Sequence, residues 1–404
     1  MFFWKRRKLV FHINEDSIPY KRKYMRNKDY EQRKYYYLFR SYMEQLERRG
    51  GGVIEVEQGT YPLTNNICIP SDVELNLADG VVFKKEGTAK RDICYAKSLF
   101  TIVPPSIERK RKKVRGYRGS KNVSIIGNGT VFLDCNNVKN CMAIAMGGAQ
   151  NVKIQGISFV NGYGAHFIEL NSSCDVLVEH CSFGNFQLVG KKSYKECINV
   201  DGNDGVTNGF NFDWSAHDRT VCKNIVIRNN SFSHVGTAIG SHTYSCVMGR
   251  QLYHENVQIL GNIVDGTYNS FVKAMNWKDC VIENNVFRNL QILSDGKLKK
   301  NGRPVRYPGL KLMGVVNPHI MGNTFDTLHY YPIRIVQEHS PWTTGGREAG
   351  YPPTVCEISE EKMRDMRNNT ILNLTNEKYL KIVLRREDSQ TDSSADKINM
   401  LKEG

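Results

Sequence analysis

The chain has 404 residues, an apolar fraction of 40% and a formal charge of +15, with an isoelectric point near 9.2. It is long enough to bury a sizeable core, as one elongated domain or two compact ones. The basic balance favours polyanions such as nucleic acid, anionic lipid or an acidic polysaccharide. No run of about 18 apolar residues occurs, so we expect no membrane-spanning helix.

The first 48 residues are basic and tyrosine-rich, and they end in a helical pattern that places Tyr36, Leu38, Tyr42 and Leu46 on one apolar stripe. Three glycines at 50–52 end this helix. The apolar stretch at 9–13 is too short for the core of a secretory signal, so we expect no export signal in the sequence as written. Localisation therefore stays open between the cytoplasm, the default, and the cell exterior.

Short segments with period-two alternation follow, separated by Gly, Pro, Asn and Asp, at 53–57, 59–61, 67–70, 73–77 and 81–83. Seven later segments share one pattern and begin at Asn122, Asn151, Asp175, Asn224, Asn256, Asp279 and Asn317. Their starts lie 29, 24, 49, 32, 23 and 38 residues apart, so the shortest spacings give the bare coil and the longer ones add loops. Stacked coils bury apolar faces that a single coil cannot bury, which indicates a solenoid.

Two residue types keep the same position in these coils. Phenylalanines recur at Phe159, Phe183, Phe232, Phe287 and Phe325, and asparagines recur at Asn230, Asn262, Asn285 and Asn323. We expect the rings to stack inside and each amide to bond to the next at a bend. A β-sandwich, the alternative fold, does not require this register.

The pattern therefore predicts an all-β chain that forms a parallel β-helix. We expect a basic segment and capping helix at 1–48, about nine coils at 49–380, and a polar tail at 381–404 that is disordered after Arg386. A helical pattern and a final strand within 357–380 are expected to cap the far end. The eleven cysteines occur singly without a CxxC pair, so we interpret them as small buried hydrophobes and expect neither a metal site nor a cofactor.

Two stretches, Gly-Gly-Gly-Val-Ile-Glu-Val-Glu-Gln-Gly-Thr-Tyr at 50–61 and Ile-Pro-Ser-Asp-Val-Glu-Leu at 69–75, add a resemblance to a known family. With the repeats, they resemble the pectin-lyase-like superfamily of right-handed, single-stranded parallel β-helices over roughly residues 30–375. The chain looks closest to polysaccharide-active bacterial members, including the polygalacturonase-like hydrolases, which implies a carbohydrate-active enzyme. Where those hydrolases have an Asp-Asp pair this chain has Lys195-Glu196, and near their Gly-His-Gly it has Ser233-His234-Val235.

A second strand in each coil presents polar residues outward between apolar ones. One outward file contains Glu169, Asn199, Gly240, Lys273, Lys311 and Arg334, and the other contains Asn171, Asp201 and His242. We expect Asp201 to face solvent in a groove, with Glu169 one coil before it and His242 one coil after it.

This face predicts a saccharide site. Two carboxylates with separated pKa values can cleave a glycosidic bond, and the candidate catalytic residues are Asp201, Glu169, His242, Glu196 and Asp213. Cations can bind uronate, sulfate or phosphate groups, and the candidate substrate-binding residues are Lys273, Lys311, Arg334, Asn199, Trp277, Trp214 and His217. His166 and His234 are interpreted as structural.

Three functions stay open for this face. The first is a glycoside hydrolase acting on an acidic polysaccharide. The second is a lyase or C5-epimerase that uses His242, Lys273 or Arg334 as the base, and the third is a non-catalytic glycan-binding or tailspike-like protein. Basic runs at 108–118 and 296–307 are solvated loops or gather acidic polymer. Nucleic acid is less favoured as the partner because no aromatic-interleaved platform accompanies these runs.

Overall fold

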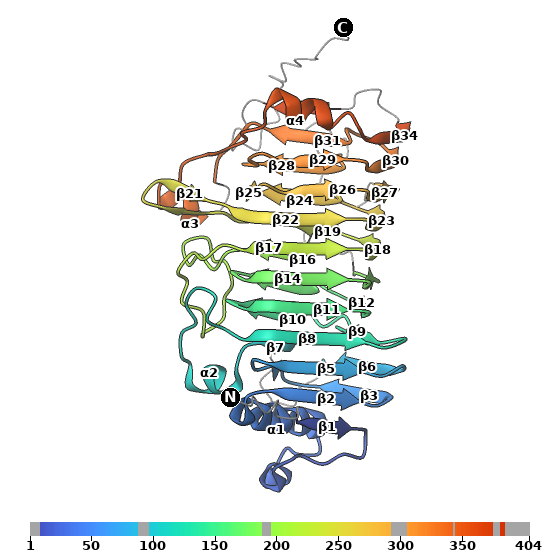
Figure 1. Ribbon diagram of the computed structural model, residues 1–404, viewed down its shortest axis with the longest axis vertical. Helices are drawn as coiled ribbons and strands as arrows, with labels where there is room; N and C mark the ends of the chain where they lie inside the picture. Colours follow the sequence, from blue (N-terminus) through green and yellow to red (C-terminus); the bar gives the residue numbers. More distant parts are fainter. Residues whose placement is uncertain are drawn as a thin grey trace, which may run out of the picture.

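The computed structural model describes residues 9–87, 97–187, 195–291, 305–341, 344–374 and 380–383. The chain winds into a column of stacked coils, and successive coils add strands to three long parallel sheets (Figure 1). The predicted β-helix is therefore confirmed. Among the described residues, no helix is long and apolar enough to cross a membrane.

The three sheets, called A, B and C here, run the length of the column. Sheet A contains β1 (Val10–Ile13), β2 (Gly52–Val56), β5 (Val73–Leu77), β8 (Lys121–Gly127), β11 (Gln150–Gln155), β14 (Cys174–Glu179), β17 (Lys223–Arg228), β22 (His254–Leu260), β26 (Val281–Glu283) and β29 (His319–Met321), and β25 (Trp277–Lys278) pairs with β22. Sheet B contains β3 (Gly59–Leu63), β6 (Val81–Lys85), β9 (Phe132–Asp134), β12 (Ser158–Val160), β15 (Ser182–Gly184), β18 (Ser231–Val235), β23 (Ile263–Thr267), β27 (Val286–Arg288), β30 (Thr324–Leu328) and β34 (Thr370–Leu374). Sheet C contains β4 (Ile67–Cys68), β7 (Ser98–Ile102), β10 (Met142–Gly147), β13 (Ile168–Asn171), β16 (Glu196–Asp201), β19 (Thr237–Gly240), β24 (Val272–Met275), β28 (Leu310–Met313), β31 (Ile333–Val336) and β35 (Leu380–Val383).

The column interior contains the predicted phenylalanine stack. The rings of Phe159 and Phe183 are 4.7 Å apart and nearly parallel, and those of Phe183 and Phe232 are 4.6 Å apart. Val264 pairs with Phe232 and interrupts the stack. The stack resumes at Phe287, which lies 5.3 Å from Phe325.

The predicted asparagine ladder follows the turn from sheet A to sheet B. Asn230 donates from its side chain to Oδ1 of Asn262 at 3.0 Å, and Asn262 donates in the same way to Asn285 at 3.0 Å. Asn285 continues to Asn323 at 2.8 Å, and Asn323 continues to Asn369, one rung beyond the prediction. The same oxygens accept from the backbone amides of Asn230, Asn262 and Asn285, which fixes the bend in these coils.

The N-terminal end of the column is closed by α1 (Lys34–Arg49), which ends at Gly50 in the left-handed conformation with φ +79°. Its fully buried apolar residues are Leu38, Phe39, Met43 and Leu46, while Tyr36 and Tyr42 of the predicted stripe are half-buried at its edge. Phe39 packs against Phe83 of the second coil, with ring centroids 5.0 Å apart. Residues 1–48 also contain β1, which adds a strand to sheet A, and a short 3-10 helix, η1 (Arg22–Arg26).

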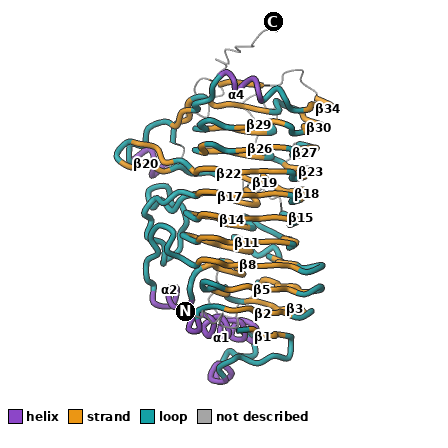
Figure 2. Tube along the Cα trace, viewed as in Figure 1, coloured by secondary structure: helices purple, strands orange, loops and turns teal. Residues whose placement is uncertain are grey.

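The remaining elements lie in loops and at the far end. They are α2 (Pro105–Lys110), α3 (Thr344–Glu348), α4 (Glu360–Asp365), the hairpin of β20 (Ser245–Val247) and β21 (Arg250–Leu252), and the pair of β32 (Glu338–His339) and β33 (Thr354–Val355). The loops after β7, β16, β19 and β31 leave sheet C at the same corner, and Figure 2 shows long loops gathered on one side of the column. The ten cysteines among the described residues are unpaired and buried, as expected. Cys94, most of the run at 296–307 and the tail from 384 onward lie outside the described residues.

Candidate functional site

The outer face of sheet C carries the polar residues that the alternation predicted. Strand pairing places Glu169 beside Asn199, Asn199 beside Gly240, and Gly240 beside Lys273. Lys311 and Arg334 continue the file in the next two strands. The apolar neighbours of these residues, such as Ile198 and Val200, are fully buried in the column core. The register of the first file is therefore confirmed.

Seven side chains meet on this face, and we call them the outer-face cluster: His166, Glu169, Glu196, Asn199, Asp201, His242 and Lys273. Asn199 joins the two carboxylates of the predicted pair, since its amide donates to Oε1 of Glu169 at 3.1 Å and to Oδ2 of Asp201 at 3.2 Å. Nδ1 of His242 lies 3.1 Å from the same Asp201 oxygen. Asp201 thus has the predicted neighbours in the adjacent coils.

The expectation that Asp201 faces solvent is wrong. Asp201 is 1% exposed, because the segment after β19 folds back over its carboxylate. The backbone amides of His242 and Thr243 point at Oδ1 from 3.3 and 3.4 Å. Glu169 and Lys273 are also buried, and the side chain of His242, 31% exposed, is the part of this cluster most open to solvent.

Glu196, the first residue of β16, forms the charged centre of the cluster. Its Oε1 is ion-paired with Nζ of Lys273. Gly240 makes room for this contact, because a Cβ there would lie 2.7 Å from the carbonyl oxygen of Lys273 and 3.3 Å from Cγ of Glu196. The site therefore needs a residue without a side chain at position 240. The place of Gly240 in the outward file did not reveal this requirement.

Two imidazoles stack on the other side of Glu196. The rings of His166 and His242 are 5.4 Å apart and 17° from parallel. Nδ1 of His166 lies 2.6 Å from the backbone oxygen of Glu196, and its Nε2 lies 3.5 Å from Oε2 of Glu169. His166 was interpreted from sequence as structural, yet it contacts two of the candidate carboxylates.

The pKa values of the two central carboxylates are shifted in opposite directions. Burial, together with the negative charges of Glu169 and Glu196, raises the pKa of Asp201 well above its ordinary value. Burial also opposes ionisation of Glu196, but the ammonium group of Lys273 outweighs it and holds the pKa of Glu196 below its ordinary range. Burial lowers the pKa of both His166 and His242, so both imidazoles are neutral near pH 7.

One trio within the cluster has the residue types of a metal site. His166, Glu196 and His242 each offer a ligand atom within 4.8 Å of the others. Lys273 already supplies a positive charge to Glu196, however, and Nδ1 of His242 lies 3.0 Å from Oδ1 of Asn199. These contacts satisfy the trio from within the protein, so we assign it no metal.

Four other predicted residues lie apart from this cluster. Trp277 is fully buried and donates from Nε1 to Oγ of Ser241 at 2.7 Å, and Trp214 is 3% exposed and packs against Phe210. Because both rings are buried, neither indole can stack on a sugar. Asp213 is exposed in the loop after β16, where its backbone oxygen accepts a bond from Lys113, and His217 is half-buried in the same loop.

Two carboxylates of the loop after β16, those of Asp204 and Asp218, fix its position through hydrogen bonds and an ion pair. Asp204 accepts a hydrogen bond from the hydroxyl of Tyr351 at 2.7 Å and contacts Arg219 at 3.4 Å. Asp218 accepts from the backbone amide of Gly116 at 2.7 Å. This loop is therefore a fixed wall beside the carboxyl ends of the sheet C strands.

The parallel coils and their one-sided loops define a right-handed parallel β-helix. No family model matches the chain. It is 25% identical over 295 residues to the plasmin and fibronectin-binding protein A of Streptococcus pneumoniae (strain ATCC BAA-255 / R6), a match that covers 69% of this chain and 39% of that protein. The chain thus matches well under half of the relative's length.

Two solved structures of the Streptococcus pneumoniae surface adhesin PfbA have the same fold. One superposes with a TM-score of 0.59 at 17% identity, covering 87% of this chain and 85% of that chain. The other has a TM-score of 0.56 at 19% identity, covering 84% of this chain and 78% of that chain. At these identities the likeness establishes the fold.

Proposed function

We propose that the chain is a glycan-binding protein that holds an anionic polysaccharide along the outer face of sheet C. The observation that carries this proposal is the run of half-exposed cationic and polar side chains on that face. Lys311 and Arg334 are adjacent in register, and His242 lies towards the N-terminal end of the same face. Strands step by about 4.8 Å, which is close to the length of one sugar unit.

The names of the relatives favour binding over catalysis as the function. The pneumococcal proteins are described as a plasmin- and fibronectin-binding protein and as a surface adhesin. A carboxylate that attacks or protonates a polymer must reach it, and Asp201 and Glu196 are each 1% exposed. Surface cations need no such opening to bind uronate or sulfate groups.

A binding panel tests this proposal with polygalacturonate, alginate and hyaluronan as acidic polymers and dextran as the neutral one. The double variant Lys311→Ala/Arg334→Ala should bind the preferred acidic polymer roughly tenfold more weakly, with a shallower salt dependence. Lys223→Ala is the matched control, since Lys223 is a 42% exposed, ion-paired lysine on sheet A. Equal binding of dextran, or an equal loss in the control, would contradict the proposal.

Hydrolysis of the bound glycan is a second candidate, favoured by the opposite pKa shifts of Asp201 and Glu196. Two carboxyl groups with oppositely shifted pKa values that contact the same imidazole of His242 have the residue types of an acid and a base. If they cleave, Asp201→Asn should lower the release of reducing ends by about a hundredfold or more. Unsaturated products would instead assign elimination, with neutral His242 as the base. If the polymer stayed intact in every assay, glycan binding would remain as the only proposed function.

A further inference from the structure

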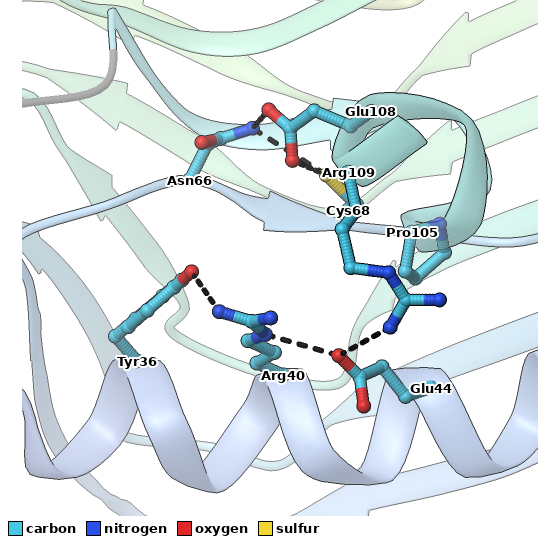
Figure 3. Close-up of a pocket in the computed structure, with 8 residues that line it drawn as sticks. All are labelled: Tyr36, Arg40, Glu44, Asn66, Cys68, Pro105, Glu108 and Arg109. Atoms are coloured by element: carbon cyan, nitrogen blue, oxygen red, sulfur yellow. Dashed lines mark hydrogen bonds and ion pairs between the residues drawn. The ribbon is translucent and has the colours of Figure 1, made fainter. Parts of the chain in front are cut away.

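A cavity of about 240 Å³ lies at the N-terminal cap, between α1, α2 and the start of sheet C (Figure 3). It is lined by Tyr36, Arg40, Glu44, Asn66, Cys68, Pro105, Glu108 and Arg109. Cys68 and Glu169 belong to one outward file, through Thr101 and Ala145. The cavity is nevertheless separate from the outer-face cluster, because the buried rings of Phe210 and Trp214 pack over this face beside Cys68.

The carboxylates of this cavity already have hydrogen-bond donors. Oε1 of Glu44 accepts from Nε of Arg40 at 3.0 Å, and Oε2 accepts from the hydroxyl of Tyr24 at 2.7 Å. On the opposite wall, Glu108 accepts from Asn66 at 2.9 Å and from the thiol of Cys68 at 2.7 Å. Each of these four oxygens therefore has a partner within the protein.

The guanidinium groups keep unused donors. Of the five N–H groups of Arg40, the contacts among the described residues engage the one on Nε and one on Nη1, which donates to the hydroxyl of Tyr36 at 2.9 Å. Arg109 touches Glu44 from 3.7 Å and its side chain is 51% exposed. Figure 3 shows the two guanidinium groups approaching the same Glu44 from opposite sides. A cavity with surplus donors and occupied acceptors fits a ligand rich in acceptors.

The chain that leaves this cavity strengthens its preference for anions. Seven cationic residues are exposed within ten positions: Arg109, Lys110, Arg111, Lys112, Lys113, Arg115 and Arg118. This basic segment is held in place, since Val114 donates its amide to the backbone oxygen of Trp214 at 2.8 Å and Ala216 returns a bond at 3.1 Å. A fixed concentration of positive charge beside a cavity raises the local concentration of anions and their rate of entry.

We propose that this cavity is an anion site that takes one acidic sugar unit, whose carboxylate or sulfate is held between Arg40 and Arg109. Its volume is below that of pockets for drug-sized ligands, which matches a monosaccharide. Binding is non-covalent. Burial and the neighbouring Glu108 raise the pKa of the Cys68 thiol well above its ordinary value, so this sulfur stays protonated and is not a nucleophile. The site does not depend on the function proposed for sheet C.

Titration of the full chain with D-glucuronate, glucose 6-sulfate and D-glucose, followed by ligand-observed NMR, tests the proposal. We expect saturable binding of at least one of the two anions and none of glucose, and the stronger anion identifies the head group. Arg109→Ala should weaken that binding about tenfold. Arg109→Lys keeps the charge but loses the planar guanidinium that can donate two parallel hydrogen bonds, so it should weaken binding less. The matched control is Arg288→Ala, since Arg288 is 47% exposed and ion-paired with Asp265 on sheet B.

Three results would overturn the proposal. They are equal binding of glucose and the anions, an equal loss of binding in Arg288→Ala, and binding of a short single-stranded oligonucleotide that depends on Arg109 while neither sugar anion binds. The last would assign the basic segment to nucleic acid. Lys311→Ala/Arg334→Ala separates this site from sheet C, because it should leave the Arg109-dependent part of monosaccharide binding unchanged whatever it does to polymer binding.

Discussion

Two stacks of polar side chains run along this column, and they are built differently. The asparagine ladder repeats one residue type at the bend between sheets A and B, and each Oδ1 from Asn262 to Asn369 accepts from the preceding rung. The outer-face cluster combines several residue types, with opposed charges and shifted pKa values. A stack that only stabilises the coils can repeat one residue type, because every rung makes the same hydrogen bonds. A stack that varies from rung to rung while burying charge carries a stability cost, which makes it the candidate site.

The strongest test of this contrast is Glu196→Gln. Removing this charge leaves the ammonium of Lys273 buried without its anion, so the free energy of unfolding should fall by about 3–5 kcal/mol. Urea denaturation measures it. The double variant Glu196→Gln/Lys273→Met should recover part of the loss, and a Glu196→Gln protein as stable as wild type would show that the pair is not buried as described.

The ladder should respond next. Asn262→Ala leaves the amide groups of Asn230 without their acceptor inside the column, and we expect a loss of about 2–4 kcal/mol. Asn224→Ala is the matched control, because Asn224 makes similar amide contacts between coils at an exposed position. Similar losses in the two variants would contradict a special role for the buried ladder.

A pH series separates the two stacks further. The folded-state pKa of Asp201 is raised, so its contribution to stability is present below the ordinary value of 3.8 and is lost as the pH rises through the folded-state pKa. Asp201→Asn removes this dependence. The stability of the variant relative to wild type should therefore improve by about 1 kcal/mol or more between pH 4 and pH 8.

The ladder provides the reference for that series. Asn262 does not titrate, so the difference between Asn262→Ala and wild type should stay constant over the same pH range. A flat difference for Asp201→Asn as well would mean that Asp201 is ionised in the folded protein throughout.

The smallest effect on stability is expected on the half-exposed part of the outer face. Lys311→Ala removes a side chain whose neighbour in register, Arg334, has the same charge, so the free energy of unfolding should change by no more than about 0.5 kcal/mol. Glycan affinity should fall in the same variant. A large loss of stability without a loss of binding would place Lys311 with the structural residues.

Local periodicity explains which predictions were right. Alternation along each strand predicted which residues face the core, and the recurrence of Phe183, Phe232, Asn262 and Asn285 predicted the stack and the ladder. These features depend on residues a fixed number of positions apart, and the parallel register carries them from one coil to the next. The same register predicted that Glu169, Asp201 and His242 would meet.

The burial of that site and the place of its other members were decided only by the tertiary structure. No periodicity indicates that the segment at His242 and Thr243 folds over Asp201, or that Gly240 leaves room for Lys273 to reach Glu196. Nor does it indicate that Trp214 and Trp277 turn inward. The cap cavity likewise forms from α1, β4 and α2, which are separated in sequence and packed together by the closure of the column end. The sequence by itself determined which side chains point out of the solenoid, because a strand alternates its faces. Which of them remain in contact with water depended on how the loops pack over the coils, since burial and charge pairing are set by contacts between distant parts of the chain.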